Sequence, residues 1–233
     1  MKVIKINNEI KVPKINDRTY VVNDYITRKG ASSIVVPISM EWKTAGTYSF
    51  TLTEEKEVTI ALIGGGGGGS TISNNTIAAG GGGGSGAGFI GTVILTAGIY
   101  TVTVGGGGWN NHGYSAGITA GPGGATTLVN NNTSTTIISA GGGAGGTCGD
   151  LVYSYGWGGA GGTIDTSNAT IVSSTLNSNG NNGPVGSGST TYPNVYYAES
   201  LYNGYGRGGG AGAGSTAGTV GFASVAWLDI VNG

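Results

Sequence analysis

Seven runs of glycine interrupt this chain, and they constrain its fold more than any other feature. With an occasional Ala, Ser or Pro among them, they occupy residues 64–69, 80–88, 105–108, 121–124, 141–146, 158–162 and 208–214. Because glycine loses the most backbone freedom on ordering, an isolated run is normally a flexible linker. These runs, however, alternate with short segments rich in β-branched residues, and a linker has no reason to recur between elements that must pack together. We therefore expect the runs to be ordered.

The segments between the runs alternate apolar and polar residues, as β-strands do. A turn followed by an alternating strand occurs at residues 45–52 and again at 97–104, and the strand at 58–63 leads directly into glycine. Further strands are expected at residues 89–95, 126–129, 135–139 and 222–230. The repeating unit is strand, glycine run, loop, glycine run, strand.

Ordered glycine runs can adopt the polyproline II conformation, with three residues per turn and a rise of about 3.1 Å per residue. Such helices have no internal hydrogen bonds, so their N–H and C=O groups must pair with neighbouring runs. Only glycine lets backbones approach so closely from all sides. The sequence thus predicts a mainly β and irregular fold, in which a sandwich of polyglycine II helices carries short strands at one end.

Charge divides the chain into two parts. Sixteen of the 21 charged residues lie within residues 1–57. We therefore predict an N-terminal attachment segment at residues 1–45 and a glycine-rich receptor-binding domain at residues 46–233. The first segment is expected to be β-rich, with a hairpin that turns at Asn7-Asn8 and further strands near residues 20–22 and 34–38.

Composition also excludes several classes of protein. The basic residues of the first segment are spread out rather than gathered into a patch, so nucleic-acid binding is not expected. We find no signal peptide and no stretch of about 18 apolar residues, so membrane insertion is not expected either. Cys148 is the only cysteine and His112 the only histidine, which leaves no intrachain disulfide and no usual zinc site. No cofactor or metal is predicted.

The direction of each run follows from counting, if the strands lie at one end of the bundle and each run crosses it once. Strand pairs at residues 89–104, 125–140 and 163–176 then lie at the near end as hairpins. The count requires one further outward run, and the Asn-rich residues 177–188 are the only candidate for it. The run at 208–214 then returns inward. The far end receives loops at residues 70–79, 109–120, 147–157 and 189–207.

Ten of the fourteen aromatic residues after Gly64 fall in these far loops. Tyr and Trp offer rigid, amphipathic contact area and are enriched in binding hot spots and antibody-like loops. The candidate receptor-binding residues are Trp109, Asn110, Asn111, His112, Tyr114, Tyr153, Tyr155, Trp157, Tyr192, Tyr196, Tyr197, Tyr202 and Tyr205. The alternative is that these aromatic side chains pack on one another and only stabilise the conformation of the long loops. The other four aromatics, Phe89, Tyr100, Phe222 and Trp227, lie on strands and are expected in the core.

A strand leading into six residues of glycine or alanine, at 58–69 and again at 137–146, resembles the glycine-rich adhesins at the distal end of T-even-like phage long tail fibres. The resemblance covers roughly residues 46–233. It implies a polyglycine II sandwich whose intervening loops bind a host-cell surface receptor, either a protein or a glycan. It also implies an N-terminal part that attaches to the tail fibre or another virion protein. The chain would be made in the host cytoplasm and end at the fibre tip.

Other functions are less well supported by the residues. A Ser–His–Asp set is not persuasive with a single histidine, and a polysaccharide depolymerase would need a carboxylate pair. Only Asp150 and Glu199 fall in the far loops, with Asp165 near a strand, so we predict that the chain is not an enzyme. A structural or surface-layer protein remains an alternative. An ice-binding protein is another, although aromatic loops of unequal length argue against the flat face it would need.

Overall fold

The computed structural model describes residues 4–6, 9–11, 21–22, 33–72, 80–113, 117–149, 155–187, 198–210 and 216–232. Strands and extended glycine runs make up these residues, which include no helix and hence none long and apolar enough to cross a membrane. The expectation of a mainly β fold is confirmed.

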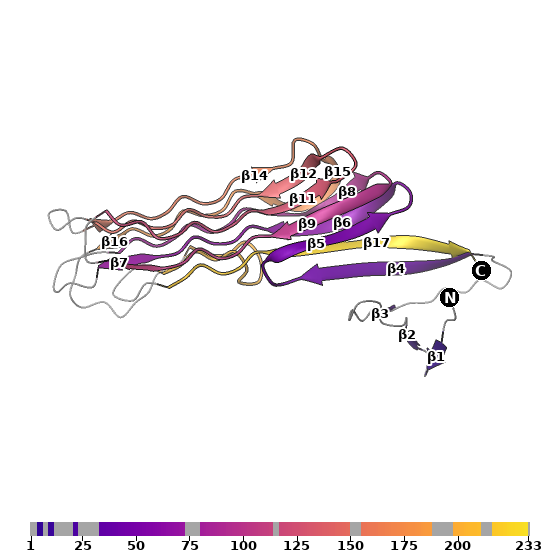
Figure 1. The fold of residues 1–233 in the computed structure, drawn as a ribbon, viewed down its shortest axis with the longest axis horizontal. Coiled ribbons are helices and arrows are strands. Elements are labelled where there is room, and N and C mark those ends of the chain that lie inside the picture. The colour runs from indigo at the N-terminus through magenta and orange to yellow at the C-terminus, as the bar shows by residue number, and fades with distance from the viewer. Residues whose placement is uncertain are drawn as a thin grey trace.

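Two five-stranded antiparallel sheets form one end of the molecule (Figure 1). The first sheet has the order β15-β8-β6-β17-β4, with strands at Thr170–Ser178, Gly88–Leu95, Lys56–Ile63, Phe222–Asn232 and Ser33–Trp42. The second has the order β14-β12-β11-β9-β5, with strands at Ile164–Asp165, Thr135–Ala140, Thr126–Asn130, Gly98–Val104 and Gly46–Leu52. The strands expected after Gly46 are all present.

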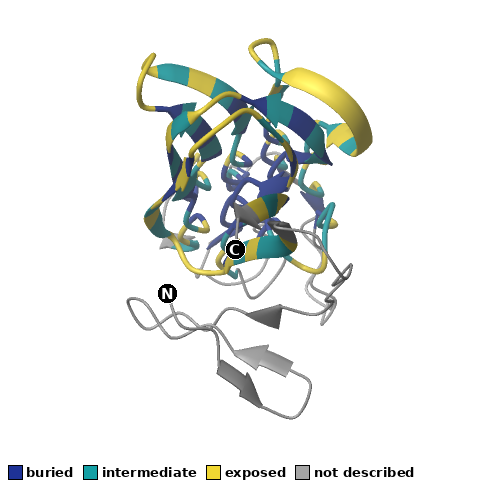
Figure 2. Ribbon diagram, turned by 90° about the vertical axis from the view of Figure 1, so that its right-hand side faces the viewer, coloured by how far each residue is buried: buried dark blue, intermediate teal, exposed yellow. Residues whose placement is uncertain are grey.

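The hydrophobic core lies between the two sheets (Figure 2). Each sheet turns alternate residues inward, so Val58, Ile60 and Leu62 of β6 are fully buried while Thr59 is exposed. All four aromatics expected in the core are buried: Phe89, Tyr100, Phe222 and Trp227. The aromatic rings of Phe50 and Tyr100 stack with centroids 5.2 Å apart.

Two of the three hairpin predictions are wrong. Strands β11 and β12 do pair as an antiparallel hairpin. Strand β8, however, pairs with β6 and β15, whereas β9 pairs with β5 and β11 in the opposite sheet. Strands β14 and β15 are likewise divided between the sheets. A strand with one buried face fits either sheet, and the Ala-Gly turn at residues 97–98 serves a crossing between sheets as well as a hairpin.

Strand β4 belongs to the sandwich although it precedes the predicted domain boundary. It pairs with β17 over ten residues, from Ser33 with Asn232 to Trp42 with Ala223. The boundary at residue 45 therefore does not separate β4 from the glycine-rich body. Farther upstream, β1 (Ile4–Ile6) and β2 (Glu9–Lys11) form the expected antiparallel pair, and β3 (Val21–Val22) joins them in a three-stranded sheet.

The glycine runs leave the sandwich as rows that lie side by side (Figure 1). The run at residues 64–69 lies at the centre and is buried throughout. Its N–H groups donate to carbonyls of three runs in turn. Gly64 and Gly67 donate to residues 87 and 84, Gly65 and Gly68 to residues 124 and 121, and Gly66 and Gly69 to residues 219 and 216. Its carbonyls accept from three more, at residues 105–111, 141–146 and 206–210. The central run thus has six hydrogen-bonded neighbours, in a pattern that repeats every three residues.

The hydrogen bonds order the runs into three layers. The upper layer holds residues 120–124, 141–146 and 158–162; the middle layer holds 105–108, 64–69, 80–87 and 180–184; the lower layer holds 216–221 and 206–210, beside residue 198. At most inner positions a Cβ would overlap a neighbouring backbone, as Gly67 would with the carbonyl oxygen of Ala144. Several side chains within the runs lie at outward positions, where Pro122, Ala144 and Ala160 are exposed, whereas Ser85 and Ala87 are buried.

The predicted hidden run is confirmed. Ser85 donates to the carbonyl of Asn181, and Gly82, nearer the far end, donates to that of Pro184. Residues 180–186 therefore run outward, beside the inward run at 80–87. Asn182 and Asn181 are exposed, as expected for an outer run.

The last predicted crossing is wrong. Instead of one inward run at 208–214, residues 206–210 run outward and residues 216–221 return. Gly209 donates to Gly67, and the chain then comes back past Gly69 and Gly66, which donate to Thr216 and Thr219. The earlier inward return is made by residues 198–202, which contain no glycine. An edge position leaves room for side chains, so this crossing has no glycine signal.

Candidate binding surface

Short strand pairs join the runs at their far ends. Strand β7 (Ser70–Ile72) pairs in parallel with β10 (Asn111–Gly113), and β13 (Tyr155–Gly156) pairs antiparallel with β16 (Gly186–Ser187). Strands β7 and β16 lie at the end of the molecule opposite the two sheets (Figure 1). The described parts of the loops predicted at 70–79, 109–120 and 147–157 therefore share this end, which we call the distal end.

Two tryptophans are exposed at the distal end. Trp109 follows the run at 105–108 and is 60% exposed, and Trp157 precedes the run at 158–162 and is 52% exposed. The indole of Trp109 lies over Gly121, because a Cβ added there would first meet its ring atoms. Both indoles thus face solvent on backbone that the runs hold in place.

Two threonines lie between the tryptophans. Single antiparallel bridges join Thr119 to Thr147 and Thr147 to Trp157. Residues directly opposite in an antiparallel pair project to the same face, and the two threonine hydroxyls are 2.9 Å apart. The Asn111 side-chain amide donates to the carbonyl of Thr119 at 3.4 Å, and Asn110 and Asn111 are partly exposed. We call Trp109, Asn111, Thr119, Thr147 and Trp157 the tryptophan strip.

Several candidate residues lie outside the described part of the chain. These are Tyr114, Tyr153, Tyr192, Tyr196 and Tyr197. For His112 in β10 and Tyr155 in β13 the backbone lies at the distal end, and the side chains are not described. Receptor contact by these seven residues, as by the described candidates, stays a prediction.

The predicted distal position of Tyr202 and Tyr205 is wrong. Their rings lie 5.2 and 5.0 Å from that of Phe222, at the start of β17. Gly206 follows at once and lies against Gly64, the first glycine after β6. The non-glycine return at 198–202 brings these tyrosines back to the sheets, so they do not join the tryptophans.

Sequence reasoning missed Thr119 and Thr147. Threonine is common throughout this chain, so composition gives no reason to select these two. The available signal was their position at the ends of glycine runs that counting brings to one end.

Among the described residues near the distal end, few titratable groups have a shifted pKa. Cys148 is fully buried, and this burial raises the pKa of its thiol, although a hydrogen bond with Ser70 opposes the shift. Within the described residues, no group of three His, Cys, Asp or Glu side chains is arranged to hold a metal ion. Of the carboxylates weighed for catalysis, Asp150 lies outside the described residues and Asp165 lies on β14, where a backbone hydrogen bond from Ser167 lowers its pKa.

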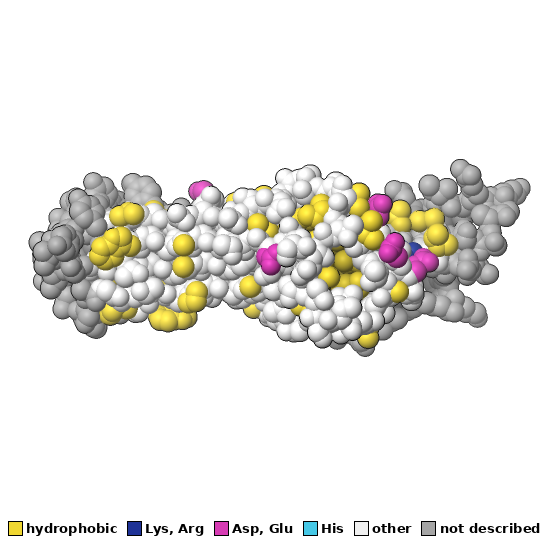
Figure 3. All heavy atoms as spheres, turned by 90° about the horizontal axis from the view of Figure 1, so that it is seen from above, with side chains coloured by type: hydrophobic (Ala, Val, Ile, Leu, Met, Phe, Trp, Pro, Cys, Tyr) yellow, Lys and Arg dark blue, Asp and Glu magenta, His cyan; other side chains and the backbone are white. Residues whose placement is uncertain are grey.

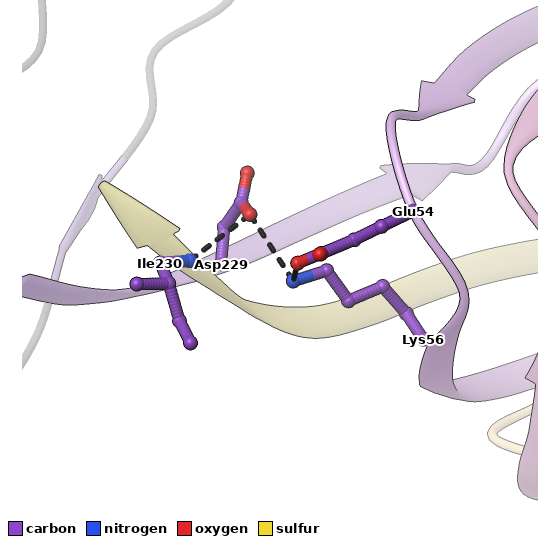
Figure 4. A network of polar contacts seen from close by, with 4 residues as sticks. All are labelled: Glu54, Lys56, Asp229 and Ile230. Atoms are coloured by element: carbon purple, nitrogen blue, oxygen red, sulfur yellow. Dashed lines mark hydrogen bonds and ion pairs between the residues drawn. The ribbon is translucent and has the colours of Figure 1, made fainter. Parts of the chain in front are cut away.

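The sandwich has a cavity of about 300 Å³ beside β4 and β17, lined in part by Met40, Leu52 and Trp227. Lys56 lies at its edge and pairs with Glu54 and, at 3.3 Å, with Asp229 (Figure 4). The hydrogen bond to Glu54 raises the pKa of Lys56, and desolvation partly opposes it. Nothing in this ion-paired cluster suggests a reaction.

The fold and its distal end together define an all-β glycine-rich protein, in which a two-sheet sandwich is extended by hydrogen-bonded glycine runs. The chain belongs to the family of glycine-rich domains, whose sequence profile matches residues 43–229. A comparison with curated protein sequences finds no match.

Proposed function

We propose that this chain is the tip adhesin of a phage tail fibre and binds a receptor on the host-cell surface through its distal end. The observation that carries the proposal is the exposure of Trp109 and Trp157 on a rigid support. Large aromatic side chains are normally at least partly buried, and Trp dominates binding hot spots. Two indoles left more than half exposed at one end of a protein favour a binding surface.

The scaffold proposed for this adhesin is a bundle of polyglycine II helices. The hydrogen-bond pattern of residues 64–69, which repeats every three residues, supports this conformation because its period is three residues per turn. All backbone partners of the central run belong to other runs. Distal loops can then vary in sequence without disturbing the bonds that hold the bundle, as suits a protein that changes its receptor.

Attachment to the tail fibre or another virion protein is proposed for the N-terminal segment. Its charge differs from that of the body, and it enters the sandwich through β4, at the end opposite the tryptophans. An adhesin needs its attachment and receptor surfaces at opposite ends. Because β4 is part of the sheet, the separable part of this segment is residues 1–32.

The indoles also bear on the ice-binding alternative. Such a protein needs a flat, regular face, whereas the exposed indoles of Trp109, over Gly121, and of Trp157 interrupt the surface of the upper layer. We therefore do not favour ice binding.

Binding to cells tests the proposal. The purified chain, labelled with a fluorophore, is mixed with a panel of bacterial strains and cell-bound fluorescence is measured by flow cytometry. We expect saturable binding to a subset of strains, displaced by unlabelled protein and inhibiting adsorption of a phage that infects them. Absence of specific binding to every strain that such phages infect would contradict the proposal.

A further inference from the structure

We propose that the tryptophan strip is a carbohydrate-binding site, and that the receptor bound there is an uncharged glycan of the cell surface. This inference rests on the proposed adhesin function and names the chemistry of its ligand. The proposed site lies on the side of the distal end, over the upper layer of runs, and not at the tips of the loops.

The spacing of the strip follows from its hydrogen bonds. Thr119, Thr147 and Trp157 lie on three adjacent segments joined by antiparallel bridges. With about 4.8 Å between neighbours, the outer two segments are about 10 Å apart. The indole of Trp109 lies over Gly121, on the same segment as Thr119. The two indoles are therefore separated by about this width, with Thr119 on the same segment as the Trp109 ring and Thr147 on the segment between.

The chemistry of the strip matches that of a sugar chain. A sugar ring presents C–H groups on its faces and hydroxyl groups around its rim. An indole offers a broad apolar face with one N–H donor, so each tryptophan can stack against a ring face. The hydroxyls of Thr119 and Thr147 can each donate and accept, which suits the rim of a sugar lying between the indoles.

Charge and area favour a neutral glycan over other occupants. The described residues at 105–113, 117–124, 141–149 and 155–162 include no Asp, Glu, Lys or Arg, and His112 is their one histidine. Hydrophobic side chains gather beside the distal end in Figure 3, with no charged group drawn next to them. A protein partner typically buries about 800 Å² on each side, far more than a strip three segments wide offers.

The backbone beneath the strip holds its groups in place. Trp157 and Thr147 exchange two backbone hydrogen bonds of 2.9 Å, and Gly121 donates to the carbonyl of Trp109 at 2.9 Å. Little ordering is then needed when a ligand binds, which reduces the entropic cost of association.

Binding of oligosaccharides tests the inference directly. The intact chain is applied to an array of neutral and acidic bacterial surface oligosaccharides, and the strongest binder is titrated by the change in tryptophan fluorescence. We expect a neutral oligosaccharide to bind and to inhibit attachment to cells. Trp157→Ala should weaken its affinity at least about tenfold, with Trp157→Tyr weakening it less because an aromatic face remains.

Two further variants complete the test, one that displaces the Trp109 indole and one that serves as a control. Gly121→Ala should displace the indole of Trp109 without removing it, because the three atoms nearest to the new methyl group all belong to that ring. We expect it to weaken sugar binding severalfold. Leu228→Ala is the matched control, since Leu228 is 61% exposed on the sheet at the other end, and it should leave binding unchanged.

Treatment of cells distinguishes the inference from the proposed function. Periodate, which cleaves sugar diols, should abolish cell binding, while protease should not. If protease removes binding and periodate does not, or if sugar binding is insensitive to both Trp157→Ala and Gly121→Ala, the carbohydrate site is refuted and the adhesin function stands. If the chain binds neither cells nor any oligosaccharide, both are refuted.

Discussion

Replacing Gly67 by alanine should strongly destabilise the protein. The N–H of Gly67 donates to Gly84 and its carbonyl accepts from Gly209, at 2.9 and 2.7 Å. A Cβ at this position would overlap the carbonyl oxygen of Ala144. The run at residues 141–146 must then move away from the central run.

The magnitude follows from the bonds that this movement breaks. Two hydrogen bonds of 2.9 Å join the run at 141–146 to the run at 64–69. Each buried group left without a partner costs about 1–3 kcal/mol, so leaving only the two N–H groups unpaired costs about 2–6 kcal/mol. Alanine restricts the unfolded chain and returns about 0.4–1 kcal/mol. A net loss of about 1–5.6 kcal/mol corresponds, for a chain of this size, to a fall in Tm of about 2–22 °C.

Gly106→Ala is the matched control. The nearest atom to a Cβ at Gly106 is the Cβ of Ala45, at 3.8 Å. This substitution should be neutral, or stabilise by up to about 1 kcal/mol through the unfolded state. Both variants are compared with the wild type by calorimetry and urea unfolding. Equal melting of Gly67→Ala and wild type, or equal destabilisation by the two variants, would show that the runs do not depend on close backbone packing.

Four other predictions separate binding, stability and assembly. Tyr100→Ala should lower the free energy of unfolding by about 3–5 kcal/mol, as a core truncation does, and leave cell binding by the folded protein unchanged. Trp109→Ala should do the reverse, weakening cell binding by about 2 kcal/mol if the indole is a central anchor, with an unaltered Tm. Deleting residues 1–32 should abolish assembly onto the particle in a reconstitution assay but not receptor binding, and normal assembly would place the attachment surface elsewhere. Because the pKa of Lys56 is raised, its ion pairs should contribute to the stability of the folded protein at neutral pH, and this contribution should be lost as pH rises above the usual lysine range of about 10.4. The difference in Tm between wild type and Lys56→Gln should therefore be smaller at such high pH than at neutral pH.

Counting the runs predicted much of the architecture because a chain that leaves the sheets must return to them. This rule predicted an outward run at residues 177–188, where glycine is sparse, and the structure has it at 180–186. It also assigned Trp109 and Trp157 to one end although they are far apart in sequence. The alternation of apolar residues likewise identified the strands and the buried aromatics, since one face of each sheet must be covered.

The same reasoning failed where glycine is not required. Residues 198–202 cross the bundle at its edge, where Glu199 can point into solvent, and their composition resembles that of a loop. The missed crossing placed Tyr202 and Tyr205 at the wrong end. The sequence also could not predict which of the two sheets each strand joins. Alternation indicates that one face of a strand is buried, but it does not say in which sheet the strand lies. The extent of β4 became evident only from its register with β17.

Exchange of the distal loops tests the central claim most directly. Residues 109–118, 147–157 and 188–197 are replaced together by the corresponding loops of a related adhesin with a different host range, and phage carrying the chimera are plated on both hosts. We predict that host range follows the loops and that the purified chimera keeps a Tm close to that of the parent, because most hydrogen bonds of the runs lie outside these segments. If host range instead stays with the parental sheets and runs, the receptor surface does not lie at the distal end.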